Sequence, residues 1–152
     1  MLTQCQNDYS LINRSSEDSG ILRYCRDNDI TFFAYMVLEQ GALSGKYDTK
    51  HPMPAGSARA ETYNLVLDKL EILNAELKKL ADKYGVGAAQ IPVAWAIAKG
   101  TLPIIGVTKE NQVLDAVKAA NVTLTAEETE ELEKVADSLE LNVIRFWEKE
   151  MK

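Results

Sequence analysis

Two segments of the sequence combine glycine with lysine, which are residue types that can hold a phosphate group. The first is Tyr35–Tyr47 (YMVLEQGALSGKY) and the second is Gly106–Gln112 (GVTKENQ). Glycine lets backbone N–H groups approach phosphate oxygens, and Lys46 and Lys109 would each add a positive charge. Thr108 is a suitable cap for a helix, whose N-terminus favours an anion. Taken separately, each segment is also typical of a plain turn with a solvated lysine, so the residues alone leave both interpretations open.

Side chains suited to acid–base or metal chemistry are sparse. His51 is the only histidine, and its loop, which is rich in proline and glycine (DTKHPMPAGS), indicates a solvated side chain. Asp8 and Tyr9 are better placed, because they follow the first expected strand. No Ser–His–Asp set, carboxylate pair or metal-ligand cluster stands out, so no metal site is predicted. Cys5 and Cys25 are too few and too separated for a disulfide framework or a zinc site, and we expect two buried thiols.

The elements that must position these segments alternate between strand and helix. Short apolar runs predict strands at Leu2–Gln6, Ile30–Tyr35 and Leu102–Val107, and the last two are apolar enough to be covered on both faces. Apolar periodicity, chain breakers and a capping box at Thr125 predict helices over residues 18–27, 61–84, 88–99, 111–120, 125–138 and 142–149. The helix over 88–99 is apolar nearly all round and is expected to be buried. This order predicts an α/β fold whose parallel strands are joined by helices.

Composition restricts the function classes. The chain has 152 residues, of which 46% are hydrophobic, and this is typical of one globular domain over residues 1–152. Its 23 acidic and 17 basic side chains give a net charge of −6, which argues against nucleic acid as a partner. The sequence holds no apolar run of about 20 residues and no signal-peptide pattern at its start, so we expect a cytoplasmic protein with no membrane partner.

The order and spacing of several motifs resemble the aldo-keto reductases. The motifs are QNDYSL from Gln6, ITFFAY from Ile30, GALSGKY from Gly41 and PIIGVTK from Pro103, and they extend over nearly the whole chain. Members of that family are (β/α)₈ TIM barrels that bind NADPH and reduce carbonyls. The resemblance implies that this chain corresponds to the sixth, seventh and eighth strands with their helices. The expected fold is therefore a truncated, partial barrel with about three parallel strands and flanking helices.

The resemblance also implies which residues contact NADP(H). Gln6 would meet the nicotinamide carboxamide and Tyr35 would lie against the nicotinamide ring. The residues implied to line the pyrophosphate are Leu38, Gln40, Gly41 and Lys46. Arg59 is implied to cover the adenosine side. The residues implied to hold the adenosine and its 2′-phosphate are Gly106, Thr108, Lys109, Gln112 and Asp115.

Three departures separate the chain from the family pattern. Met36-Val37 stands where the family has Ser-Pro, which removes a hydroxyl contact, and Asp115-Ala116 stands where it has Glu-Asn, which weakens adenine recognition. The family's catalytic tyrosine, lysine, aspartate and histidine come from the first four strands, and this chain does not match those segments. Tyr9 and Tyr35 match other family positions. We therefore predict no catalytic residue here and no activity of the chain alone.

Three hypotheses follow for what such a chain does. It is the cofactor-binding part of an oxidoreductase without catalysis of its own, or it is a reductase when a separate N-terminal barrel half complements it. In the third hypothesis it is a non-enzymatic interaction module. A partial parallel sheet leaves unpaired edges and uncovered inner faces, so we expect self-association or a complementing half as the partner. The residues do not indicate a substrate.

Overall fold

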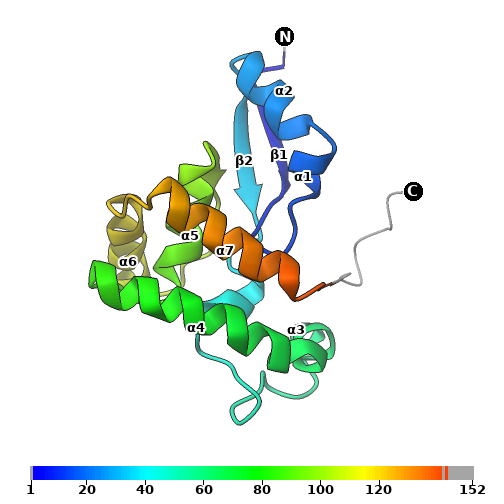
Figure 1. Cartoon of the computed structure of the whole chain (residues 1–152), viewed down its shortest axis with the longest axis vertical. Helices are drawn as coiled ribbons and strands as arrows, with labels where there is room; N and C mark the ends of the chain where they lie inside the picture. Colours follow the sequence, from blue (N-terminus) through cyan, green and yellow to red (C-terminus); the bar gives the residue numbers. More distant parts are fainter. Residues whose placement is uncertain (1, 142, 144–152) are drawn as a thin grey trace.

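A three-stranded parallel sheet organises the chain in the computed structural model, which describes residues 2–141 and 143 (Figure 1). Strands β1 (Gln4–Asp8), β2 (Thr31–Tyr35) and β3 (Leu102–Pro103) lie in the order β1-β2-β3. In this register Gln6 pairs with Phe33, and Phe33 pairs with Leu102. The predicted α/β class with about three parallel strands is therefore confirmed.

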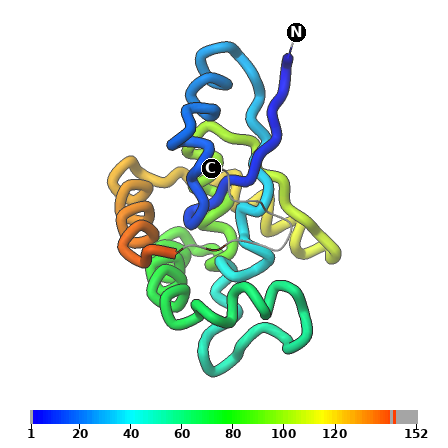
Figure 2. Tube along the Cα trace, turned by 90° about the vertical axis from the view of Figure 1, so that its right-hand side faces the viewer, coloured from blue at the N-terminus to red at the C-terminus, as the bar shows by residue number. Residues whose placement is uncertain are grey.

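Helices connect and cover the strands. The α-helices are α1 (Ser15–Asp18), α2 (Ile21–Asp27), α3 (Ala58–Tyr63), α4 (Leu67–Tyr84), α5 (Gln90–Ala98), α6 (Glu110–Ala120) and α7 (Ala126–Ser138), and the 3₁₀ helices are η1 (Glu39–Ser44) and η2 (Asn64–Val66). The loop between η1 and α3 extends away from the sheet at the lower end of the molecule (Figure 2). The predicted helix over 142–149 falls on residues outside the described ones, apart from Val143.

Several boundaries differ from those predicted, and the helix expected over 18–27 begins only at Ile21. The first strand begins two residues later than expected, and the third pairs only over Leu102–Pro103 instead of Leu102–Val107. Pro103 has no N–H to donate, and after Ile104 N donates to Ala34 O at 2.7 Å the backbone leaves the ladder. The helix expected over 61–84 is divided, because the cap at Ser57 starts α3 early and the 3₁₀ turn η2 separates it from α4.

Within the described residues, helices cover only one face of β2, which corrects the prediction that this strand is covered on both faces. Phe32 and Ala34 are buried, whereas Phe33 and Tyr35 on the other face remain partly exposed. An apolar strand run predicts a buried strand only when other elements lie over both faces, as the remaining strands of a closed barrel do. Helix α5 is buried over Gln90–Ala96, as predicted, and Pro92 lies in its first turn.

Polar contacts fix the outer helices. The capping box at Thr125 is confirmed: Thr125 Oγ1 accepts from Glu128 N at 3.2 Å, and Glu128 Oε2 accepts from Thr125 N at 2.9 Å. Glu128 also pairs with Lys83 at 2.6 Å and accepts from the Tyr84 hydroxyl at 2.6 Å. Burial opposes ionisation, but these donors prevail and hold the pKa of Glu128 at about 2. Helix α7 is thereby tied to α4.

Apolar side chains are exposed around β3 and α6. Leu102 and Ile104 lie at the third strand, and Leu114 and Val117 are more than half exposed on α6. Of the two cysteines, Cys25 is buried as predicted, and Cys5 is only half-buried. None of the described helices has the length and apolar character needed to span a membrane.

Candidate functional site

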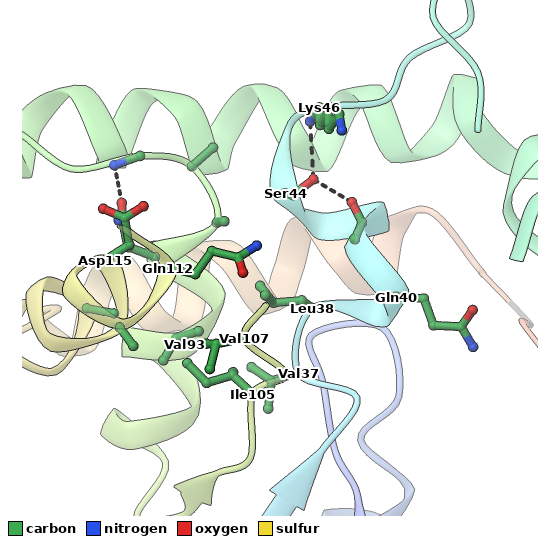
Figure 3. A pocket seen from close by; sticks show the side chains of 18 of the residues that line it. Val37, Leu38, Gln40, Ser44, Lys46, Val93, Ile105, Val107, Gln112 and Asp115 are labelled. Atoms are coloured by element: carbon green, nitrogen blue, oxygen red, sulfur yellow. Dashed lines mark hydrogen bonds between the residues drawn. The ribbon is translucent and has the colours of Figure 1, made fainter. Parts of the chain in front are cut away.

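A cavity of about 710 Å³ opens beyond the C-terminal ends of β2 and β3, at the start of α5 and α6. Its volume is within the range of small-molecule and cofactor sites. Figure 3 shows Val37, Val93, Ile105 and Val107 gathered at its apolar side, with Lys46 and Ser44 on one flank and Gln112 and Asp115 on the other. The residues of the lining that could contact a polar ligand are Gln40, Gly41, Lys46, Tyr47, Arg59, Thr108, Gln112 and Asp115.

The turn that follows β2 has an unusual backbone. Glu39, Gln40 and Gly41 have φ angles of 47°, 54° and 97°, so three successive residues adopt the left-handed conformation. For a residue other than glycine this costs about 1–2 kcal/mol. Gly41 N donates to Leu38 O at 2.8 Å and closes the turn. The side chain of Gln40 points away from Val37 and Ile105, so Gln40 presents mainly its backbone to the cavity (Figure 3).

Four side chains from distant segments hold this turn. Ser10 Oγ donates to Glu39 Oε1, and the Tyr63 hydroxyl donates to Glu39 Oε2, each at 2.5 Å. Arg59 Nη1 donates to Gln40 O at 3.3 Å, and Asn74 Nδ2 donates to Ala42 O at 2.9 Å. The turn therefore keeps its shape through contacts with the segment after β1 and with α3 and α4.

Two cations flank an aromatic ring at the edge of the cavity. Lys46 Nζ and Arg59 Cζ each lie 5.4 Å from the centre of the Tyr47 ring. The electron-rich ring stabilises both charges. This arrangement concentrates positive charge beside the left-handed turn Glu39–Gly41. Positive charge next to such a turn favours an anionic ligand such as a diphosphate.

The opposite side of the cavity is the loop that leads into α6. Gln112 Oε1 accepts from Thr108 N at 2.7 Å and from Lys109 N at 3.0 Å. Lys109, and not Thr108, is the first residue before the helix, which corrects the predicted cap. A Cβ added at Gly106 would meet nothing within 4 Å, so the chain itself does not require glycine there. Open space of this kind is suited to a ligand that lies close to the backbone.

The cavity brings together most of the residues that the family resemblance implied. The implied residues that line it are Leu38, Gln40, Gly41, Lys46, Arg59, Gly106, Thr108, Gln112 and Asp115. Gln6, Tyr35 and Lys109 do not. Gln6 is exposed in the middle of β1, Tyr35 is half-buried at the end of β2, and Lys109 is exposed beside Thr108. Their roles at a cofactor stay predictions.

The acid–base candidates proposed from strand position lie outside the cavity lining. Tyr9 is fully buried, stacks on Trp95 with ring centres 5.0 Å apart, and donates to Glu17. Burial and that hydrogen bond raise the pKa of Tyr9 well above its ordinary value, so it is not a ready proton donor. Asp8 is buried, and His51 is exposed beside Asp48. Among the described residues no group of histidine, cysteine or carboxylate side chains could hold a metal ion.

Sequence reasoning missed Ser10, Glu39 and Tyr63. Glu39 lies within the expected phosphate segment Tyr35–Tyr47, and nothing in its local sequence distinguishes a buried carboxylate from a solvated one. Tyr63 is 24 residues further along the chain and Ser10 is 29 residues earlier. Only the packing of α3 and of the segment after β1 against the turn reveals the cluster.

Comparison with known proteins agrees with this architecture. The model of the Aldo/keto reductase family matches residues 2–137. This chain belongs to the aldo/keto reductase family. Family members are generally NAD(P)H-dependent oxidoreductases. The chain is 33% identical to the chloroplastic pyridoxal reductase of Arabidopsis thaliana over 135 residues, which are 89% of this chain and 36% of that protein.

Two further relatives show the same partial coverage. The NADH-specific methylglyoxal reductase of Escherichia coli is 32% identical over 144 residues, which are 89% of this chain and 42% of that protein. The glycerol dehydrogenase of Gluconobacter oxydans has a solved structure that superposes with a TM-score of 0.81 at 23% identity, over 96% of this chain and 46% of that one. The chain thus spans less than half the length of these relatives, and its fold is that of part of an aldo/keto reductase barrel.

Proposed function

We propose that this chain holds NADP(H) in the cavity described above, as the cofactor-binding part of an aldo/keto reductase. The observation that carries the proposal is the convergence on one cavity of a strained backbone turn, two cations and the start of α6. A dinucleotide needs these features in this combination: positive charge for its diphosphate, apolar walls for its rings and an open backbone for close approach.

The residues present fit such a cofactor at the diphosphate and adenosine groups. Lys46 and Arg59 supply the charge, and Gly106 leaves space beside Gln112 and Asp115. Lys109 is the cation on the adenosine side, exposed next to Thr108, and we propose that it favours a 2′-phosphate. Because the E. coli relative is named as NADH-specific, the preference between NADPH and NADH is part of the test.

We also propose that the chain alone does not reduce carbonyls. The bound cofactor supplies hydride, and carbonyl reduction further requires a proton donor beside the substrate oxygen. Tyr47 is the tyrosine of the described cavity lining, and its ring contacts two cations that have a diphosphate-binding role in this proposal. Tyr9 is buried elsewhere.

Isothermal titration calorimetry of the whole chain with NADPH and with NADH tests this proposal. We expect binding of NADPH, weaker binding of NADH, and loss of NADPH affinity in the Lys46→Ala and Arg59→Ala variants. A matched exposed lysine on α4, Lys79→Ala, should change nothing, because Lys79 is outside the cavity lining and pairs with Glu76 on its own helix. No binding of either dinucleotide would refute the binding proposal, and aldehyde-dependent NADPH oxidation by the pure chain would refute the lack of catalysis.

A second function follows from the exposed apolar residues around β3 and α6. We propose that these side chains and the outer edges of β1 and β3, which no described strand pairs with, pack against the remaining β/α units of a barrel, so that the reductase is complete only with them. Co-expression with the N-terminal half of an aldo/keto reductase should then produce NADPH-dependent aldehyde reduction. If the chain instead self-associates and the mixture stays inactive, the surface serves as an interaction module, and sedimentation velocity distinguishes these outcomes.

A further inference from the structure

We infer that Glu39 is a positioning residue for the dinucleotide: its buried carboxylate holds the turn Leu38–Gly41 in the shape that it presents to the diphosphate. The inference rests on the proposed function, because it assigns the turn to a particular part of that ligand. It concerns a residue that does not itself line the cavity.

The carboxylate of Glu39 is anchored from two sides in the interior. Glu39 is 1% exposed, and its two hydroxyl partners, Ser10 and Tyr63, are fully buried. Each partner donates to a different carboxylate oxygen at 2.5 Å. Ser10 is itself fixed, because its Oγ accepts from Asn13 N at 3.1 Å. The carboxylate therefore joins the turn to the segment after β1 and to α3.

The backbone at this point needs such an anchor. Glu39 and Gln40 are successive non-glycine residues with positive φ, and an unsupported chain would relax away from that conformation. Leu38 and Gln40, on either side of Glu39, line the cavity. An anchor at residue 39 therefore determines where the backbone of both neighbours lies.

The cost of burying an acid also argues for a specific role. An apolar side chain at position 39 would fill the same space without the desolvation of a carboxylate. A carboxylate can accept from two hydroxyls at once and hold the backbone against its preferred conformation, which an apolar side chain cannot do. The same chemical pair, a tyrosine hydroxyl on a carboxylate, occurs between Tyr84 and Glu128 on the outer helices, away from the cavity lining.

That second pair supplies a matched control. The experiment compares Tyr63→Phe and Glu39→Gln with Tyr84→Phe in the whole chain, by calorimetric titration with NADPH and with adenosine 2′,5′-bisphosphate. The second probe carries the adenosine end of the cofactor but lacks the diphosphate and the nicotinamide. Thermal melting of each variant is recorded in parallel to measure stability independently of binding.

We expect Tyr63→Phe and Glu39→Gln to bind NADPH about tenfold more weakly, which is the effect of one charge-assisted hydrogen bond. Their affinity for adenosine 2′,5′-bisphosphate should stay within a factor of about two of the original, since Gly106 and Gln112 lie on the other side of the cavity. Tyr84→Phe should lower the melting temperature and leave both affinities unchanged.

Two results would overturn the inference while leaving the proposed function intact. One is NADPH affinity unchanged in Tyr63→Phe, which keeps the aromatic ring and so tests the hydroxyl alone. The other is an equal loss of affinity for both probes, which indicates general loosening of the fold. If the unaltered chain binds neither probe, the proposed function fails and this inference fails with it.

Discussion

A valine at position 106 should weaken dinucleotide binding while leaving the fold intact. Gly106 lines the cavity, has no left-handed φ, and has open space where a Cβ would point. The folded chain therefore gives no reason for glycine at this position. If glycine is needed there, the need comes from a ligand that lies against the backbone.

The two expected effects have opposite signs, which makes the prediction specific. For folding, Gly106→Ala should stabilise the chain by about 0.4–1 kcal/mol, because it reduces the freedom of the unfolded state and meets no clash. For binding, Gly106→Val places three carbons in the space that the ligand would occupy, and a loss of about tenfold or more in NADPH affinity corresponds to about 1.4 kcal/mol.

Urea unfolding and calorimetric titration measure these two effects separately. Gly41→Ala is the contrasting variant: Gly41 has a φ of 97°, so alanine there is strained and should cost about 1–2 kcal/mol of folding stability. The reasoning is refuted if Gly106→Val binds NADPH as tightly as the unaltered chain. It is also refuted if Gly106→Ala destabilises the fold by more than about 1 kcal/mol, since the space would then not be free.

Three predictions concern the outer helices. Lys99→Met should destabilise the chain by about 1–3 kcal/mol in urea unfolding. The Lys99 ammonium lies 3.1 Å from Glu17 and 2.9 Å from Glu133, so the substitution leaves both carboxylates without their cation. An unchanged unfolding midpoint would show that this cation is dispensable. Thr125→Ala should cost about 1 kcal/mol by removing the helix cap, with Thr129→Ala as a control inside α7. Glu128→Gln should lower the melting temperature at pH 7, and the difference should fade as the pH falls from about 4.3, the ordinary glutamate value, towards 2. The pKa of Glu128 is depressed, so its stabilisation is present above the unfolded-state pKa and disappears on protonation; a difference that persists at pH 2 would contradict this assignment.

Local signals in the sequence predicted local structure well. The capping box at Thr125 and the uniformly apolar run over 88–99 each depend on residues within one or two turns, and both appear as expected. The third strand was predicted too long because its extent depends on pairing partners, and only β2 is available to it in the described residues. The prediction that Ile30–Tyr35 is covered on both faces was wrong for the same reason. Burial depends on neighbouring elements, which an apolar run cannot specify.

The candidate site likewise contains residues that local sequence identifies and residues that only distant contacts identify. Lys46 and Gly106 could be found because glycine and lysine beyond a strand have a direct chemical meaning. Glu39 could not, because its role arises from hydroxyls that are 24 and 29 residues away in sequence. Lys109 shows a further limit, since a family resemblance implies a residue type at a position but does not determine where its side chain lies.

The arrangement of the cavity explains how the proposed cofactor pocket could form on a chain that spans less than half the length of its relatives. Its described walls come from the turn after β2, the start of α5 and the segment from β3 into α6. Helix α5 contacts both β3 and α6, and the turn after β2 contacts α4. The other face of β2, in contrast, leaves Phe33 and Tyr35 partly exposed, and we expect strands from elsewhere to cover them. Tyr35 was expected to lie against the nicotinamide, so the reactive end of the cofactor would meet the uncovered part of the sheet. Binding of the diphosphate and adenosine is therefore expected of this chain, and orientation of the nicotinamide is expected to need the rest of the barrel.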